Sequence, residues 1–319
     1  MAKKSKRLLS ILLAVMMLLT MFPITMPTMV ASAAGEVSVD TWEELRDALK
    51  SETDKVVTLA KDITYEAYNT GYHGVKADIV LDLNGYEIKV KNTYDAAHPD
   101  MEEGCYEEFF NIFNGGRLTI NDSSKNGDGK ISFESYVNSA SDFEKLPIRD
   151  LFVVFDGGTL VVNGGTLQAG TIKKEWKTLF PRFSEGDPMK FTGYVYKLCY
   201  GTAVTVNKGG KAIINGGSFT GHGAGNLWDV YGNPSAGKVY DDYGDVYYGA
   251  AVKANDPTAQ IIINNGAFTG LAGADAVRFY GVDTLSRVYG GTFETKGRGD
   301  ALVRVDSSIV FDIDAGHIG

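Results

Sequence analysis

Apolar and polar residues alternate in short runs along most of the chain, and each run ends at a turn. In residues 203–221, AVTVNKGGKAIINGGSFTG, Val204 and Val206 alternate with polar residues. A period of two places successive side chains on opposite faces of a β-strand. The Asn-Gly-Gly sequence at 215–217 favours a turn with positive φ. The pattern therefore predicts a unit of short strands closed by glycine turns.

The same unit occurs seven times, and aligning the copies gives two apolar columns. The column before the turn reads Leu83, Ile120, Val162, Ile214, Ile263, Val288 and Ile313. The column after the turn reads Ile88, Ile131, Leu167, Phe219, Phe268, Phe293 and Ile318. A third column tolerates charge, so we expect it to face outward; it reads Thr119, Val161, Ile213, Ile262, Arg287 and Asp312.

The copies follow one another at a regular spacing, which is 25 residues from Phe268 to Phe293 and again from Phe293 to Ile318. A fixed period of roughly 20–50 residues is typical of a solenoid, in which each unit buries its apolar face against its neighbours. Short strands, glycine turns and no helix inside the unit predict an all-β parallel β-helix of about seven coils. The alternative is a sandwich or barrel of short strands, but a register kept across all copies favours the solenoid.

An asparagine column accompanies the turn. Its members are Asn84, Asn121, Asn163, Asn215 and Asn264. Asparagine tolerates the left-handed backbone conformation, and identical side chains stacked in a column can hydrogen-bond to one another. We therefore expect the turn asparagines to form a ladder along the solenoid.

Two motifs resemble the right-handed β-helices of the pectin-lyase-like superfamily, especially repetitive secreted and surface proteins of Gram-positive bacteria. Residues 42–49 read WEELRDAL and residues 81–88 read LDLNGYEI, similar to the motifs W-E-E-L-x-x-A-L and L-D-L-N-G-x-x-I of those proteins. The resemblance covers residues 38–319 and implies a right-handed parallel β-helix. It says little about activity, because that superfamily holds lyases, hydrolases, phage tailspikes and adhesins.

The chain is predicted to have three parts. Residues 1–35 have a basic start, an apolar stretch and a small-residue Ala-Ser-Ala site, which predict an export signal peptide; an uncleaved membrane anchor is the alternative. Residues 36–55 are predicted to hold a helix that begins at Asp40-Thr41 and covers the N-terminal end of the solenoid. Residues 56–319 form the β-helix, with its first strand over 55–65.

The net charge of the chain argues against nucleic acid as a partner. The chain has 31 basic and 40 acidic residues, and loss of the four basic residues of the signal leaves 27 against 40, a net charge of −13. Nucleic acid binding depends on Lys and Arg at the phosphates, so we expect no nucleic acid partner. We expect a secreted or cell-surface protein that has no membrane contact once the signal is cleaved.

Four insertions lengthen the spacing between units, at 91–110, 134–150, 169–200 and 221–249. They fall at one equivalent place, after the post-turn strand and before the first strand of the next coil. Coils stack at roughly 4.8 Å, so insertions at one phase line up on one side. Binding residues in such scaffolds usually lie on these loops.

The last two long insertions are rich in aromatic residues beside carboxylates. Aromatic faces stack on the C–H patches of sugars, and polar groups bind the hydroxyls. The residues predicted to bind a ligand are Trp176, Tyr194, Tyr196, Trp228, Tyr231 and Tyr243. Small hydrophobic clusters beneath the loops are the alternative. The leading hypothesis is thus a non-enzymatic, adhesin-like protein whose partner is a polysaccharide or a host or cell-surface glycan.

The second hypothesis is a polysaccharide lyase or glycoside hydrolase that acts in the groove beside these loops. Two nearby carboxylates can divide acid and base roles, and Asp241 with Asp242 are the candidates. No lyase or hydrolase sequence motif accompanies them, and acidic runs are often simply solvated.

Residues 122–129, DSSKNGDG, resemble a calcium loop, with candidate ligands Asp122, Ser124, Asn126 and Asp128. Phe133 stands where the bidentate Glu belongs, so an ordinary Asx turn is the alternative. No cofactor is expected, with Ca²⁺ as the alternative. The sequence leaves undecided whether Cys105 and Cys199 form a disulfide. The sequence stops at Gly319, and we expect a C-terminal continuation or an end-to-end partner.

Overall fold

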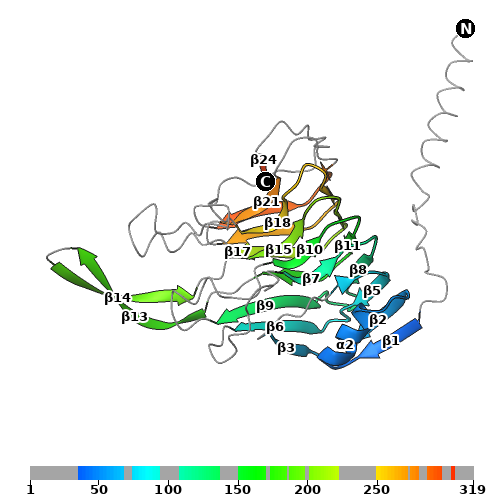
Figure 1. Cartoon of the computed structure of the whole chain (residues 1–319), viewed down its shortest axis with the longest axis horizontal. Helices are drawn as coiled ribbons and strands as arrows, with labels where there is room; N and C mark the ends of the chain where they lie inside the picture. The colour runs from blue at the N-terminus through cyan, green and yellow to red at the C-terminus, as the bar shows by residue number, and fades with distance from the viewer. Residues whose placement is uncertain are drawn as a thin grey trace, which may run out of the picture. The chain divides into compact units, whose positions relative to one another are not determined.

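Three parallel β-sheets form the fold, and along each sheet the strands follow one another in chain order (Figure 1). A computed structural model describes residues 35–67, 74–93, 108–136, 150–169, 173–184, 187–197, 201–222, 249–271, 274–279, 286–296 and 303–305. All of them belong to Ala34–Gly319, the second of the two units into which the chain divides. The protein is therefore an all-β parallel solenoid with a repeating strand pattern, as the sequence predicts.

Each coil contributes one strand to each sheet. Sheet A contains β1 (Gly35–Val39), β2 (Lys55–Leu59), β5 (Asp78–Asp82), β8 (Arg117–Asn121), β11 (Thr159–Val162), β16 (Lys211–Ile214), β19 (Gln260–Ile263) and β22 (Arg287–Val288). Sheet B contains β3 (Ile63–Ala67), β6 (Glu87–Thr93), β9 (Lys130–Tyr136), β12 (Thr166–Gln168), β17 (Ser218–His222), β20 (Ala267–Leu271) and β23 (Thr292–Lys296). Sheet C contains β4 (Gly74–Val75), β7 (Glu108–Ile112), β10 (Asp150–Val154), β15 (Thr202–Val206), β18 (Ala250–Ala254), β21 (Asp275–Phe279) and β24 (Val303–Val305).

The apolar column after the turn is confirmed in sheet B for its first six members, and the seventh, Ile318, lies outside the described residues. Parallel pairing joins, in order, Ile88, Ile131, Leu167, Phe219, Phe268 and Phe293. The rings of Phe219, Phe268 and Phe293 stack with centroid separations of 5.0 and 5.1 Å. Full burial of such a side chain contributes roughly 1.5–3 kcal/mol, so the column is a continuous source of stability from coil to coil.

The column before the turn is confirmed in sheet A from its second to its sixth copy, and the last member, Ile313, lies outside the described residues. The pairing joins, in order, Ile120, Val162, Ile214, Ile263 and Val288. The predicted first member, Leu83, is wrong, because Leu81 pairs with Ile120. Ile79, Leu81 and Leu83 are all fully buried. A shift of two residues keeps every side chain on the same face, so the apolar pattern alone cannot choose between these registers.

The predicted asparagine ladder is confirmed for four of its five members. Nδ2 of Asn163 donates to Oδ1 of Asn121 at 2.8 Å, Asn215 donates to Asn163 at 2.8 Å, and Asn264 donates to Asn215 at 2.7 Å. Asn84 lies outside the ladder, and alone in this column it has a positive φ, of 49°. The other four have no positive φ, so the hydrogen-bond ladder, and not a left-handed backbone, explains the column.

A second glycine turn lies at the corner between sheets C and A. At Gly158 a Cβ atom would lie 2.1 Å from the carbonyl oxygen of Ile112, and at Gly210 it would lie 2.1 Å from that of Val154. These contacts are with the backbone of the preceding coil, which cannot give way. Glycine at this corner therefore allows successive coils to stack at strand spacing.

Helix α2 (Trp42–Leu49) begins where the sequence predicts. Thr41 is the N-cap, its Oγ1 accepts from the N–H of Glu44 at 3.3 Å, and Glu44 Oε2 accepts from the N–H of Asp40 at 3.0 Å. The apolar face of α2 is buried in the same core as the three sheets. The single strand predicted over 55–65 is wrong, since β2 and β3 belong to different sheets.

Candidate functional site

Every long insertion leaves a strand of sheet B and returns to a strand of sheet C. The flanking strand pairs are β6 and β7, β9 and β10, β12 and β15, and β17 and β18. The flanking strands stack in parallel register, so the four points of departure succeed one another from coil to coil. We call this corner of the solenoid the insertion flank. It runs from the ends of these sheet B strands to the starts of these sheet C strands.

Sheet C, on one side of the insertion flank, is buried on both faces. Every residue of β10, β15, β18 and β21 is buried. The hydrophobic core takes the second, third and fifth positions of these strands, and the first and fourth positions are left outside it. The fourth positions pair from strand to strand as one column, which reads Asn111, Val153, Thr205, Lys253 and Arg278. We call the side of the sheet that carries this column the outer face of sheet C.

Three polar side chains meet on this outer face. Lys253 Nζ lies 3.4 Å from Asp150 Oδ2, and Thr205 Oγ1 donates to the same carboxylate oxygen at 2.8 Å. The whole-residue exposed fractions of Asp150 and Lys253 are 7% and 4%. Burial of a charge is costly unless it is paired and hydrogen-bonded. The Asp150 carboxylate is paired with Lys253 of β18 and accepts a hydrogen bond from Thr205 of β15, so its charge is compensated.

A second acid–base pair follows on the next strand. Arg278 Nε lies 3.7 Å from Asp275 Oδ2, and both residues are buried. Lys253 and Arg278 are direct neighbours in the parallel register. The outer face of sheet C therefore carries two carboxylates and two cations on three strands. Such a set can bind an anionic group at its cations, or exchange a proton at a carboxylate or amine.

His222 ends β17 at the insertion flank and is also buried. Its pKa is lowered from 6.5 to about 4 because burial disfavours the charged imidazolium. Its Nδ1 atom has no hydrogen-bond partner within the described residues, and the same holds for Nδ2 of Asn111. The imidazole ring is thus neutral near pH 7. It is buried at the end of β17, where the fourth insertion begins.

Four buried charged residues were not predicted from the sequence, although their strands carry a visible signal; they are Asp150, Lys253, Asp275 and Arg278. The strands DLFVV, AAVKA and DAVRF lack the apolar–polar alternation of sheet A. Short apolar runs without alternation are typical of strands buried on both faces. A charge within such a run is therefore expected to be buried and paired.

The predicted ligand residues of the third insertion lie on a two-stranded antiparallel sheet, β13 (Lys173–Ser184) and β14 (Asp187–Lys197). Tyr194 pairs with Lys177 and Tyr196 with Lys174, so the two tyrosine positions share one face. Trp176 pairs with Val195, between them, and occupies the opposite face. The hairpin therefore brings two of the three positions together and separates the third.

The remaining predicted residues of the insertions lie outside the described residues. They are Trp228, Tyr231, Asp241, Asp242 and Tyr243, together with the two cysteines, Cys105 and Cys199. Their predicted roles in binding, catalysis and a disulfide stay predictions.

The candidate calcium loop is a turn organised by Asp122. Its Oδ1 accepts from the N–H groups of Gly85 and Ser124 at 2.9 and 3.2 Å, and its Oδ2 accepts from that of Gly129 at 2.7 Å. Although partial burial acts in the opposite direction, the hydrogen bonds from Ser124, Gly129 and Gly85 lower the pKa of Asp122. Asn126 and Asp128 follow in the same loop. These contacts account for Asp122 as a turn residue, and calcium binding stays a prediction.

Comparisons with protein-family models, with curated proteins and with solved structures give no match to this chain. No group of three or more His, Cys, Asp or Glu residues in the described ranges is arranged to hold a metal ion. Across those same ranges, no helix has the length and apolarity needed to cross a membrane.

Proposed function

We propose that the protein is a secreted or cell-surface binding protein that recognises a polysaccharide or a host or cell-surface glycan through the insertion flank. The observation that supports this proposal is topological. Four long insertions, which lengthen the spacing between successive coils to as many as 52 residues between Leu167 and Phe219, all leave sheet B and enter sheet C. A rigid stack that carries variable loops along one corner is a common way to build an extended binding surface.

Three finer features complete the proposal for the fold. The solenoid is right-handed, as parallel crossovers almost always are, and has about seven coils like the pectin-lyase-like proteins that it resembles. Helix α2 covers the N-terminal end of the core, because its buried Trp42, Leu45 and Leu49 join the core there. Such a cover keeps the first coil from exposing apolar surface and strand edges.

Export and charge are consistent with an extracellular role in this proposal. Residues 1–35 act as a signal peptide, and the mature chain, with a net charge of −13, has no nucleic acid partner and no membrane contact. Binding needs no resident cofactor, with Ca²⁺ at Asp122–Asp128 as the alternative.

The hairpin gives this proposal a matched test. The purified chain is applied to an array of plant and host glycans, and the best ligand is then titrated by calorimetry. Tyr194→Ala and Tyr196→Ala alter one face of the hairpin, and Trp176→Ala alters the other. Loss of a stacked aromatic ring is expected to weaken binding by roughly tenfold. The proposal expects this loss on one face only; equal, unchanged affinity for all three variants contradicts glycan binding by the hairpin.

A second function is favoured by the outer face of sheet C. There Asp150 of β10 pairs with Lys253 of β18, and Asp275 pairs with Arg278 within β21. In a polysaccharide lyase a basic side chain removes a proton next to a uronate carboxylate, and in a hydrolase two carboxylates share acid and base roles. These four side chains are buried, so a substrate reaches them only if the outer face opens.

The two functions are separated by turnover. Polyuronates and neutral glycans are incubated with the chain, and unsaturated uronates and new reducing ends are measured. An enzyme loses activity by roughly a hundredfold or more in Lys253→Met or Asp150→Asn, and Asp241→Ala and Asp242→Ala test the pair in the fourth insertion. Glycan binding without any product supports the first function and rejects the second.

A further inference from the structure

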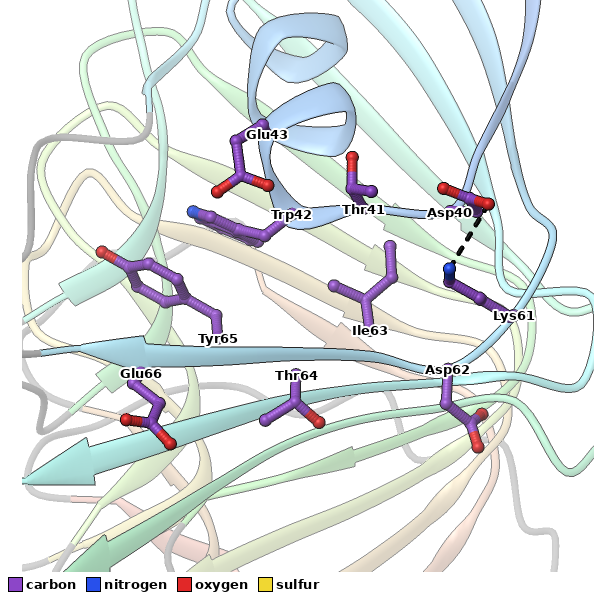
Figure 2. A pocket seen from close by; sticks show the side chains of 10 residues that line it. All are labelled: Asp40, Thr41, Trp42, Glu43, Lys61, Asp62, Ile63, Thr64, Tyr65 and Glu66. Carbon is purple, nitrogen blue, oxygen red and sulfur yellow. Dashed lines mark ion pairs between the residues drawn. The ribbon is translucent and has the colours of Figure 1, made fainter.

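A pocket of about 420 Å³ opens between the first turn of α2 and strand β3 (Figure 2). Its size falls within the roughly 300–1,000 Å³ of small-ligand sites. Its apolar surface comes from Trp42, Ile63 and Tyr65, and its polar groups include Asp40, Glu43 and Lys61. None of these residues belongs to the insertion flank.

The aromatic wall of the pocket is held rigidly. The rings of Trp42 and Tyr65 stack at 4.3 Å with an interplanar angle of 25°, and Trp42 also stacks on Phe109 at 5.2 Å. Trp42 is buried and Tyr65 is half-buried. Burial raises the pKa of Tyr65, so its phenol stays neutral near pH 7. A rigid half-buried ring of this kind can stack against the C–H face of a sugar or attract a cation.

Polar groups lie at both ends of this apolar surface. At one end Lys61 Nζ lies 3.3 Å from Asp40 Oδ2, and this pair is solvent-accessible. At the other end Figure 2 shows Glu43 beside Trp42, with Tyr65 below them and Ile63 between this group and the Asp40–Lys61 pair. Besides burial, the positive charge of Arg46 lowers the pKa of the Tyr65 phenol and the negative charge of Glu43 raises it, so both charged groups lie near the ring.

We propose that this pocket binds a hexosamine that carries a free ammonium group. The half-buried Tyr65 ring receives the apolar face of the sugar, and Trp42, which is only 6% exposed, supports that ring by stacking on it. The ammonium lies between the Glu43 carboxylate and the Tyr65 ring, where ion pairing and cation–π attraction act together. The Asp40–Lys61 pair, which offers both an acceptor and a donor, binds ring hydroxyls. The cavity and its aromatic wall form the site, and the carboxylates select an amino sugar over a neutral or acidic one.

This inference is independent of the proposed function, because it uses different residues. Removal of the aromatic positions of the hairpin leaves the pocket intact, and a change at Glu43 leaves the insertion flank intact. Failure of one proposal therefore leaves the other to be judged by its own test.

The test compares a glucosamine oligomer with its fully N-acetylated counterpart, each titrated into the full chain by calorimetry and followed by saturation-transfer NMR. The expected result is binding of the glucosamine oligomer, with an affinity that falls as salt increases, and weaker or no binding of the N-acetylated one. Glu43→Gln is expected to weaken binding by about three- to tenfold. Glu52→Gln, an equal change of charge at an exposed site outside the pocket, is the matched control.

Three results would overturn the proposal. They are no binding of the glucosamine oligomer, equal binding of the two oligomers, and equal weakening by Glu43→Gln and Glu52→Gln, which would show attraction to the acidic chain as a whole. In addition, Tyr65→Phe keeps the ring and its packing, so it is expected to keep the affinity within about twofold. A loss as large as that of Glu43→Gln would assign the binding to the phenol hydroxyl instead and contradict the proposed geometry.

Discussion

The outward columns of sheets A and C come from neighbouring strands of the same coils, yet they differ in burial. In sheet A the outward Thr119, Ile213 and Ile262 are half-buried, whereas Val161 in the same column is 4% exposed. In sheet C the equivalent Thr205, Lys253 and Arg278 are at most 4% exposed.

One solenoid can therefore expose the outward residues of one sheet to solvent and bury those of another. Sheet A meets solvent, so its outward residues are free to vary and even apolar ones are tolerated there. Sheet C is covered, so every polar group on its outer face needs a partner, and the polar side chains there are held in fixed positions. Fixed, buried, paired charges are the kind of group that functional sites use.

The largest expected effect is on the outer face of sheet C. Asp150→Ala removes the carboxylate that faces Lys253 and Thr205. Breaking a buried ion pair costs about 3 kcal/mol or more, because the remaining charge stays buried. Urea denaturation followed by circular dichroism measures this loss.

The double variant Asp150→Leu with Lys253→Met is the control for that measurement. Replacing both charges with apolar groups of similar size is expected to recover most of the lost free energy of unfolding. A double variant that is less stable than Asp150→Ala would show that the pair is not the source of the effect.

The next effect depends on pH and arises at the insertion flank. The pKa of His222 is about 4 in the folded chain, against 6.5 ordinarily. Between these pH values the unfolded chain binds a proton that the folded chain does not, so the free energy of unfolding falls as the pH falls from 6.5 to about 4. The full loss is about 3 kcal/mol, and stability above pH 6.5 is unaffected by this group.

His222→Gln, studied by thermal unfolding across the same pH range, is the comparison. The variant is expected to lose this part of the pH dependence while it keeps the part due to carboxylates. The same slope in both proteins would mean that His222 is accessible to protons in the folded chain.

A smaller effect is expected at the asparagine ladder beside sheet A. Asn215 has a ladder bond to both Asn163 and Asn264, whereas Asn264 has a ladder bond to Asn215 at the end of the described ladder. A typical hydrogen bond contributes about 1 kcal/mol. Asn215→Ala is therefore expected to cost about 2 kcal/mol, and Asn264→Ala about half of that, by urea denaturation. Equal losses in the two variants would show that the ladder bonds do not contribute separately to the free energy of unfolding.

The smallest effect is expected on the outward face of sheet A itself. Ile213→Thr keeps a β-branched side chain at a half-buried position, so the free energy of unfolding should change by about 0.5 kcal/mol or less. The matching change on sheet C, Val153→Thr, places a hydroxyl at a site that is 1% exposed and should cost about 1–3 kcal/mol. Similar costs at both sites would remove the contrast between the two sheets.

The fold could be predicted because the solenoid repeats its apolar pattern in every coil. Phe219, Phe268 and Phe293 are regular enough in sequence to predict their stacking. The register of the first copy could not be predicted, because Ile79, Leu81 and Leu83 fit the same face.

The candidate site was harder to predict from sequence, because burial on both faces of sheet C depends on what covers it. A charge such as Lys253 or Arg278 is expected at the surface unless tertiary structure buries it. The partner Asp150 lies 103 residues before Lys253 in the chain, and only the stacking of coils brings the two together. In the third insertion the backbone register places Tyr194 and Tyr196 on one face of the hairpin and Trp176 on the other, and their role in binding stays a prediction.

The most direct test of the account is a cross-link between coils at the insertion flank, in a chain with Cys105 and Cys199 replaced by Ser. Thr220 and Thr269, which lie 49 residues apart in sequence, are direct neighbours in sheet B. With both changed to Cys, dibromobimane, which bridges thiols a few ångströms apart, should cross-link them within the monomer. A control chain with Thr220→Cys and Thr119→Cys, whose sites lie in sheets B and A, should stay unlinked. Cross-linking of the control pair but not the first pair would contradict the stacking on which the insertion flank depends.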